Sequence, residues 1–413
     1  MARRTFHVPE YYQSDIVGAV KRARTAADPR RRDFSPTLLD FGPLRVRIAR
    51  HFGFCYGVEN AIEIAYKTVA DNPDKRVFLL SEMIHNPLVN QDLQEMGVRF
   101  IMTTEGEQLI PWSQLISDDI VIVPAFGTTL EIQEILEKHG IDPYSFDTTC
   151  PFVQKVWNRS AKIGKDGYTI IVHGKPQHEE TRATVSHSSQ SGPTVIVRDM
   201  TQTERLAGII TEKYPLEKFT EWFADQASEG FDPARDLLRI GVVNQTTMLA
   251  TETQAIADRL KEAMIERYGV DEIEGHFADT RDTLCYATNE NQTATTELIQ
   301  AGGDLGIVVG GYNSSNTSHL VELCEEKMPT YFVRGPEEIL SREEIRHFDL
   351  HSYSVIETDN WLPEKRPLNI LLTSGASCPD ALVDKVLLRV MELVDGTKDV
   401  EEVIRQSLTA NVA

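Results

Sequence analysis

From residue 45 onward the chain repeats one pattern of hydrophobic and polar positions. A short run of β-branched and other apolar residues leads into a polar or glycine-containing loop, and the loop leads into a stretch with amphipathic helical spacing. Such runs predict buried strands, and the helical spacing predicts helices that cover them. Strands that alternate with helices form mainly parallel sheets, so the pattern predicts an α/β protein.

The loops after these strands fall into three kinds, and each kind occurs three times. Ligands of α/β proteins usually bind in such loops, at the carboxyl ends of the strands. In the first kind a cysteine precedes or opens a helix, at Cys55, Cys150 and Cys285. The second kind is a polar loop after an apolar strand, in "VFLLSEMIHNPLV", "TIIVHGKPQHEETRAT" and "LGIVVGGYNSSNTSHL". The third is a small hydroxyl-rich loop, in "DIVIVPAFGTTLEI", "RIGVVNQTTMLATET" and "LNILLTSGASCPDALV".

The order of cysteine, polar loop and hydroxyl loop recurs in each third of the chain, which favours three similar domains around a common centre. The alternative is that any α/β chain shows some recurrence of strand, loop and helix. "VRIARHF", before the first cysteine, is expected to pair in the sheet of the third domain. The predicted parts are an N-terminal arm (1–44), domain 1 (56–149), domain 2 (150–284, with a surface insertion at about 201–236), domain 3 (45–55 plus 285–390) and a C-terminal tail (391–413).

Composition and charge narrow the class of protein. Of 413 residues, 41% are hydrophobic and 25% are charged, and no window approaches the roughly 18 uncharged apolar residues that a membrane span needs. The N-terminus lacks the apolar core of a secretory signal, and its acidic residues disfavour an organelle transit peptide, so we predict a cytoplasmic protein. A net charge of −21, spread along the chain, disfavours nucleic acid and anionic membranes as partners.

The five cysteines are too few and too scattered for a disulfide framework. Cys55, Cys150 and Cys285 share a position at a helix start, where backbone N–H groups favour a thiolate. Three thiolates from three similar domains can hold one metal cluster and leave one position vacant. A zinc site with three cysteines and simple packing of each thiol are the alternatives. Cys324 is expected to pack in a helix, whereas Cys378 in "SCPD" is a credible fourth ligand.

Donors suited to an anion occupy the other strand-end loops. Hydroxyl, amide and imidazole groups beside helix N-termini can cradle a phosphate or diphosphate without lysine. For each hydroxyl the alternative is N-capping of the following helix. Glu179 and Glu180 offer a proton donor, or an acid that interacts with a helix dipole. The candidate anion ligands are His85, His178, Thr246, Thr247, Ser314, Ser315, Asn316 and Ser377.

In combination, these motifs resemble those of the 4-hydroxy-3-methylbut-2-enyl diphosphate reductases, the IspH or LytB family of iron-sulfur enzymes in the non-mevalonate isoprenoid pathway. The resemblance covers about residues 46–385. It rests on the ordered motifs "GFCYGV", "HNP", "DTTCPFVQKV", "HEET", "QTT", "CYAT", "NSSN" and "GASCPD". It implies three α/β domains in a pseudo-threefold arrangement around a central [4Fe-4S] cluster, with Cys55, Cys150 and Cys285 as its three ligands and one iron open.

The resemblance also implies roles for other residues. Glu180 resembles the proton-relay acid, Thr246 helps to place the substrate hydroxyl, and Cys378 becomes a packing residue. Gly53 and Gly57 are interpreted as room for the chain to approach the cluster. The implied diphosphate pocket consists of His85, His178, Ser314, Asn316 and Ser377, with Ser315 as a less certain contact.

The implied reaction is reductive dehydroxylation of the allylic diphosphate to isopentenyl and dimethylallyl diphosphates. Electrons would come from a separate ferredoxin- or flavodoxin-type protein, because no complete GxGxxG motif follows a strand. A [4Fe-4S] hydro-lyase acting on a small anionic substrate is the alternative enzyme, and an iron-sulfur or small-molecule binding module is the non-enzymatic one.

One position departs from many bacterial members of the family. Phe126 in "VPAFGTT" replaces a histidine, as in the branch found in plants and cyanobacteria, which the long N-terminal arm also resembles. The replacement removes one imidazole contact from the implied pocket, and Thr128 or Thr129 is the expected compensation.

Overall fold

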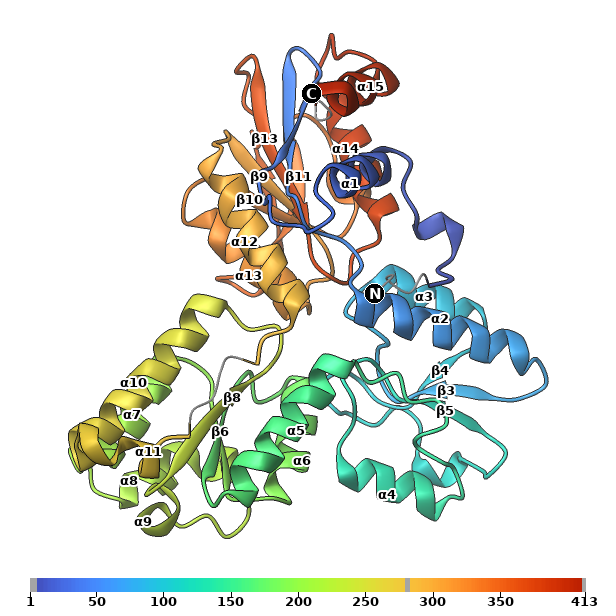
Figure 1. The fold of residues 1–413 in the computed structure, drawn as a ribbon. Coiled ribbons are helices and arrows are strands. Elements are labelled where there is room, and N and C mark those ends of the chain that lie inside the picture. The colour runs from blue at the N-terminus through green and yellow to red at the C-terminus, as the bar shows by residue number, and fades with distance from the viewer. Residues whose placement is uncertain (1–5, 279–282, 411–413) are drawn as a thin grey trace. The chain divides into compact units, whose positions relative to one another are not determined.

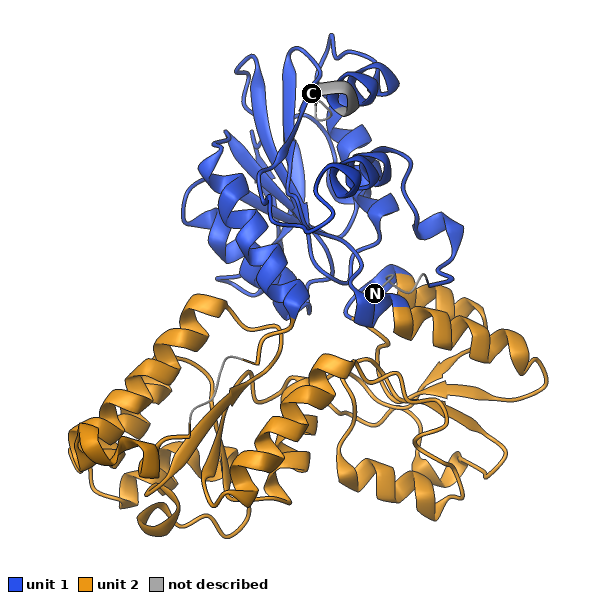
Figure 2. Ribbon diagram, in the orientation of Figure 1, with its two compact units in different colours: residues 1–59, 85–88, 286–413 blue, residues 60–84, 89–285 orange. Residues whose placement is uncertain are grey.

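Three parallel sheets with helices packed on them form the frame of the molecule (Figure 1). The computed structural model describes residues 6–278 and 283–410. The chain divides into two compact units (Figure 2). Unit 1 comprises residues 1–59, 85–88 and 286–413, and unit 2 comprises residues 60–84 and 89–285. The α/β class predicted from the sequence is confirmed, whereas the three predicted domain boundaries stay a prediction.

The three parallel sheets share one strand order. In each, the first strand of the set lies in the centre, with the second strand on one side and the third on the other. Their ladders are parallel, so the carboxyl ends of all three strands meet at the same edge of each sheet. The sets are β3 (Val77–Leu79), β4 (Arg99–Phe100) and β5 (Ile120–Ile122); β6 (Thr169–His173), β7 (Thr194–Val197) and β8 (Ile240–Asn244); and β9 (Leu305–Val309), β10 (Thr330–Val333) and β13 (Leu368–Ser374).

The sheet of unit 1 gains two further strands from the N-terminal part of the chain. β2 (Leu44–Ile48) pairs with β13 in parallel, with Val46 opposite Ile370, as expected for the segment before Cys55. β1 (Thr37–Asp40) adds an antiparallel edge to β2. A separate hairpin of β11 (Glu344–Asp349) and β12 (Ser354–Asp359) belongs to the same unit.

A helix begins directly after each of the three helix-opening cysteines. These helices are α2 (Tyr56–Asp71), α5 (Pro151–Lys165) and α12 (Tyr286–Gln300). In α5, Pro151 occupies the first turn, where its missing N–H costs nothing. Six further helices follow the strand-end loops: α3 (Pro87–Glu95), α4 (Leu130–Lys138), α6 (Glu179–Ser189), α10 (Ala250–Tyr268), α13 (Ser315–Glu325) and α14 (Asp380–Glu392).

The N-terminal arm contains regular structure that the sequence pattern does not predict. Residues 16–27 form α1 (Ile16–Ala27), which packs on α14. The carboxylate of Asp384 on α14 accepts hydrogen bonds from Ser14 Oγ at 2.6 Å, Ile16 N at 3.1 Å and Val17 N at 2.9 Å. The first N–H groups of α1 are thus bound by a residue about 370 positions away, a partner that no local pattern can reveal.

The predicted surface insertion is a local helical layer in unit 2. It contains α7 (Met200–Ile210), α8 (Glu217–Phe223) and α9 (Pro233–Asp236). Phe223 is fully buried, and Trp222 lies edge-on to Tyr214 with ring centroids 5.2 Å apart. These aromatic side chains therefore pack locally. The remaining α-helices are α11 (Ile273–His276) and α15 (Val400–Ala410).

No helix in the two described ranges combines the length and the apolar character that a membrane span requires.

The three hydrogen bonds to Asp384 predict a stability effect. Asp384→Ala should lower the free energy of unfolding by about 1–3 kcal/mol, because it leaves buried donors at the start of α1 without an acceptor. Chemical denaturation measures this change, and limited proteolysis should show earlier cleavage within residues 6–27. The control is Glu392→Ala on the same helix, which removes an exposed ion pair and should cost less than about 0.5 kcal/mol. Equal losses for the two variants would contradict the proposed anchoring.

Candidate functional site

The Cys55 loop is fixed in unit 1 by its backbone. Cys55 lies between β2 and α2, and its N–H donates to the carbonyl of Ala376 at 3.1 Å. Gly53 has a φ of +76°, and a Cβ there would overlap the carboxylate of Asp380, which pairs with Lys21. This ion pair and the backbone conformation are therefore sufficient to require glycine here, and the approach of a cluster stays a prediction.

Three of the candidate anion loops meet within unit 1. Ser377 Oγ donates to the carbonyl of His85 at 3.1 Å. Asn316 Oδ1 accepts the N–H of Ala376 at 2.9 Å, next to Ser377. A Cβ on Gly311, in the loop before Ser314, would lie 2.4 Å from the His85 carbonyl oxygen, so that glycine permits close packing. The loops after β3, β9 and β13 are thus brought together, as the resemblance implies for their side chains.

Only some of these side chains retain free donors. Ser314 is the N-cap of α13 and accepts from Thr317 N at 3.3 Å, which is the alternative that the sequence left open. Ser315 Oγ and Asn316 Nδ2 are buried, and no hydrogen-bond partner for them lies within the described part of the chain. A buried donor without a partner costs about 1–3 kcal/mol. At the N-terminus of a helix, such donors indicate an anion as the missing partner.

Glu180 and Thr246 form a buried pair in unit 2. Glu180 Oε1 accepts from Thr246 N at 2.5 Å, and Oε2 accepts from Thr246 Oγ1 at 2.9 Å. The carbonyl of Thr246 in turn accepts the N–H of Cys285 at 3.2 Å. Glu179, the neighbouring candidate, accepts a short hydrogen bond from Ser81 Oγ. The fold therefore gives the two acids different partners, and Glu180 is linked through Thr246 to a candidate cysteine.

Cys150 lies at the N-terminus of α5, and its N–H donates to Ala125 O at 2.9 Å. Burial raises the pKa of its thiol to about 11, and repulsion from Cys285 adds to this effect. The Phe152 N–H, at the helix start, acts in the opposite direction. The sequence-based expectation of a helix-stabilised thiolate is therefore outweighed by burial in the free protein. The mutual effect indicates that the two thiols are neighbours.

The imidazole ring of His178 caps a helix and contacts an aromatic side chain. Its Nδ1 accepts from Glu180 N at 3.1 Å, which assigns the ring proton to Nε2. Phe126 lies edge-on to the imidazole, with centroids 5.6 Å apart and an interplanar angle of 85°. Thr129 caps α4 by accepting from Ile132 N, and Thr128 uses its carbonyl for His187. Neither threonine is tied to His178 by these contacts, so their predicted compensation for Phe126 stays a prediction.

The other two cysteines are packing residues. Cys324 and Cys378 are buried in hydrophobic clusters of unit 1, and burial raises the pKa of each thiol to about 12. Cys378 packs in this core, as the resemblance implies, and whether it is a fourth ligand is not decided by burial.

Within residues 6–278 and 283–410, no group of three His, Cys, Asp or Glu side chains is placed to hold a single metal ion. A cubane cluster differs from a single ion, because each thiolate binds a different iron and the sulfurs need not lie within reach of one atom.

The candidates thus form two groups, each within one unit. The group in unit 1 contains two backbone elements that sequence reasoning missed, Gly311 and Ala376. It also contains Asn291, which donates to Asn316 Oδ1 at 3.4 Å. The sequence offered one signal for this residue, an asparagine in the helix after Cys285, and the structure shows that its side chain is buried. The groups are Cys55, His85, Ser314, Ser315, Asn316 and Ser377 in unit 1, and Cys150, His178, Glu180, Thr246 and Cys285 in unit 2.

Comparison with known proteins agrees with this arrangement of motifs. The profile of a family described as LytB protein matches residues 46–391. A 4-hydroxy-3-methylbut-2-enyl diphosphate reductase from Gloeobacter violaceus is 40% identical over 85% of this chain and 84% of its own. One from Nostoc sp. is 41% identical over 86% of each chain.

Solved structures show the same fold at lower identity. A structure of the E-1-hydroxy-2-methyl-but-2-enyl-4-diphosphate reductase from Plasmodium falciparum matches with a TM-score of 0.60 and 24% identity, over 84% of this chain and 87% of its own. A structure of (E)-4-hydroxy-3-methyl-but-2-enyl diphosphate reductase matches with a TM-score of 0.50 and 23% identity, over 84% and 98%.

The raised pKa of Cys150 predicts slow alkylation in the metal-free protein. At about pH 8 its thiol should react more slowly than a peptide cysteine, and the rate should rise as the pH approaches 11, because the thiolate is the nucleophile. At high pH, Cys285→Ser should speed the reaction, because it removes the repulsion between the two thiolates. Mass spectrometry after iodoacetamide treatment measures each site, with Cys324 as the unreactive control. Fast alkylation of Cys150 at neutral pH would contradict the assigned burial effect.

Proposed function

The chain belongs to the LytB protein family, and from this premise we propose that it reduces 4-hydroxy-3-methylbut-2-enyl diphosphate to isopentenyl and dimethylallyl diphosphates. The net reaction takes two electrons and two protons, breaks the allylic C–O bond, forms one C–H bond and releases water. The observation that carries the proposal is the link from buried Glu180 through Thr246 to Cys285. It joins a proton donor to a candidate metal ligand through one residue.

We assign the diphosphate to the donors that the fold leaves at strand ends. Ser315 Oγ and Asn316 Nδ2 offer buried donors at the start of α13, and Ser377 and His85 lie in the adjoining loops. Ser314 contributes its hydroxyl proton while it caps the helix, and His178 contributes the Nε2 proton. Neutral donors suit a chain with a net charge of −21, because they bind an anion without needing lysines from a mostly acidic surface.

An iron-sulfur cluster follows from the family, and we propose a [4Fe-4S] cluster with Cys55, Cys150 and Cys285 as ligands. The donor set fits, because each thiol stands at a helix start and a bound metal ion offsets both the burial of Cys150 and its repulsion from Cys285. When bound, such a cluster supplies single electrons and one Lewis-acidic iron for the substrate oxygen.

The protein's own groups handle orientation and the proton. Thr246 holds both oxygens of Glu180 through its N–H and hydroxyl, so the carboxyl group keeps one orientation. In its protonated form Glu180 delivers a proton to the oxygen that leaves as water. Thr246 Oγ1, next to that carboxyl, positions the substrate hydroxyl. Binding of the diphosphate fixes the position of the allyl chain, so that the binding energy orients the substrate.

Two electrons must enter from outside the chain. We propose a ferredoxin- or flavodoxin-type protein as their source, because the sequence carries no GxGxxG motif after a strand that would bind a nicotinamide or flavin dinucleotide. The cytoplasmic location predicted from the sequence stays a prediction.

Glu180→Gln tests the proton relay. It keeps the size of the side chain but cannot deliver a proton, so kcat should fall by about 10²–10⁴-fold with a small change in KM. Activity is measured without oxygen, with dithionite and a viologen dye as reductant. The matched control is Glu179→Gln on the same helical turn, whose partner is Ser81, and which should retain activity within a few-fold. A Glu180→Gln enzyme with full activity would remove the acid from the mechanism.

Cysteine substitutions test the ligand set. Cys55→Ser, Cys150→Ser and Cys285→Ser should each lower bound iron and sulfide, whereas Cys378→Ala should leave both unchanged, because Cys378 is a core residue. Iron and sulfide analysis of protein purified without oxygen measures the effect. Turnover without any reductant would instead favour the hydro-lyase, and full activity of Cys55→Ser would overturn the ligand assignment.

A further inference from the structure

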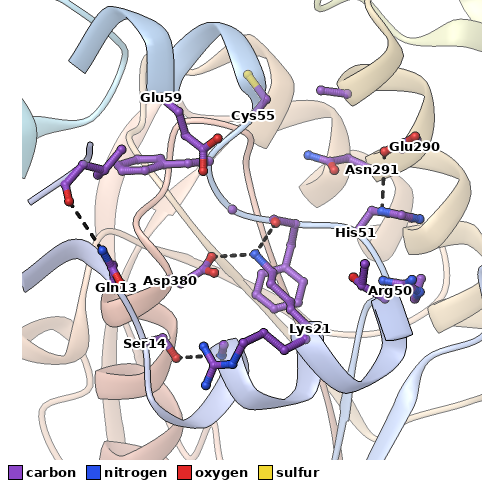
Figure 3. Close-up of a pocket in the computed structure, with 18 of the residues that line it drawn as sticks. Gln13, Ser14, Lys21, Arg50, His51, Cys55, Glu59, Glu290, Asn291 and Asp380 are labelled. Carbon is purple, nitrogen blue, oxygen red and sulfur yellow. Dashed lines mark hydrogen bonds and ion pairs between the residues drawn. The ribbon is translucent and has the colours of Figure 1, made fainter. Parts of the chain in front are cut away.

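A pocket of about 740 Å³ lies in unit 1 beside the Cys55 loop. Its walls come from the N-terminal arm, the loop of residues 50–55, the start of α12 and Asp380 on α14 (Figure 3). His85, Ser314 and Ser377, which we assign to the diphosphate, are not among its lining residues. The pocket therefore adjoins the candidate site through Cys55 and Asn291, but it does not include these three diphosphate ligands.

Arg50 brings an unsatisfied guanidinium edge to this pocket. The side chain is 5% exposed, and neither Nε nor Nη2 has a hydrogen-bond partner within the described residues. These two nitrogens form the side of the guanidinium that binds two oxygens of one oxyanion in parallel. Asp28 and Asp33 attract the charge of Arg50, but neither is hydrogen-bonded to these two nitrogens. A buried donor without an acceptor is costly, so the two nitrogens indicate a ligand.

His51 adds a second unsatisfied atom. It is 7% exposed, and its Nε2 likewise has no partner in the part of the chain that the structure describes. Its Nδ1 faces Glu290 Oε2 at 3.5 Å, which assigns the ring proton to Nδ1 and leaves Nε2 as an acceptor. Burial, followed by the charges of Arg50 and Arg31, lowers the pKa of His51 to about 4, which keeps the ring neutral.

Two other cations of the pocket are already paired. Lys21 Nζ lies 2.6 Å from Asp380 Oδ1, and Arg31 Nη1 lies 3.4 Å from Glu290 Oε2. Among the buried side-chain atoms that line the pocket, Arg50 Nε, Arg50 Nη2 and His51 Nε2 lack a hydrogen-bond partner within the described residues. A ligand that satisfies both side chains must offer two acceptor oxygens to the arginine and one hydroxyl proton to the imidazole.

We propose that this pocket binds the phosphate group of a small phosphorylated molecule, through the Nε–Nη2 edge of Arg50 and the Nε2 of His51. A monoprotonated phosphate has both the acceptor oxygens and the P–OH that these atoms require, whereas sulfate has no proton at neutral pH. The pocket volume lies within the range of small-molecule sites and exceeds what one phosphate fills, so a phosphate monoester fits better than the free ion.

The test measures phosphate binding to the holoenzyme by calorimetry. Because inorganic phosphate can also enter the diphosphate site, Asn316→Ala serves as the background in which binding at that site is weakened. In that background, Arg50→Met should weaken phosphate binding by roughly tenfold or more. Sulfate should bind roughly fivefold more weakly than phosphate. An unchanged isotherm after Arg50→Met would overturn the proposal, and equal affinity for sulfate would remove the role of His51.

Thermal unfolding provides an independent reading and a control for folding. Without phosphate, Arg50→Met should raise the melting temperature, because it removes two buried donors without an acceptor in the described residues and the repulsion from Arg24 and Arg31. With phosphate, the wild-type protein should gain stability and the variant should not. His51→Phe, which keeps the aromatic volume, should reduce the phosphate-dependent rise while the protein remains folded. A variant that melts lower without phosphate yet keeps the full phosphate-dependent rise would overturn the proposal.

A titration with a phosphate monoester identifies the form of ligand. Glycerol phosphate should bind more tightly than inorganic phosphate in the Asn316→Ala background, because the remaining pocket volume accepts its organic part. Tighter binding of the free ion would assign the site to inorganic phosphate and overturn the monoester assignment.

Discussion

Parallel pairing of the strands is the constraint on which the rest of this structure depends. In a parallel ladder every strand ends at the same edge, and each return to the sheet needs a crossover, most often a helix. The three sheets apply this rule with one strand order, so each places at least two loop-to-helix junctions at the same edge. Helix N-termini and their unpaired N–H groups gather there without any special sequence. The candidate residues are those that the rule brings to these edges.

Burial then decides what these residues can do. The pKa of Cys150 is raised although its helix start favours a thiolate, because desolvation exceeds the effect of one N–H donor. The same environment makes unsatisfied donors informative. The hydroxyl of Ser314 accepts a hydrogen bond from Thr317 N. Ser315 Oγ and Asn316 Nδ2, in contrast, have no hydrogen-bond partner among the described residues. Most buried polar atoms in proteins are hydrogen-bonded, so the exceptions mark where a ligand is needed.

The N-terminal arm is connected to the Cys55 loop by charge as well as by packing. Lys21 on α1 pairs with Asp380, donates to the carbonyl of Phe52 and lies 4.0 Å from the centroid of its ring. Gly53 makes room for the carboxylate of this pair. The arm thereby forms part of the pocket wall beside Cys55, a candidate cluster ligand. Lys21 shows that a basic residue of the arm has a structural role in an otherwise acidic chain.

The sequence by itself determined the fold class, the recurrence of three loop types and the cysteines that open helices. These features depend on local periodicity and on the residues that start a helix, and both can be read without knowing distant partners. Only the tertiary structure gave Glu179 and Glu180 different hydrogen-bond donors, because Ser81 and Thr246 lie on other strand-end loops. It also decided that Ser314 caps a helix and that Asp384 anchors α1. The tertiary structure also decided that Arg50 Nε and Nη2 lack a hydrogen-bond partner within the described residues, because this depends on how the elements around the side chain pack. Local patterns specify elements, whereas hydrogen-bond partners distant in sequence are set by how those elements pack.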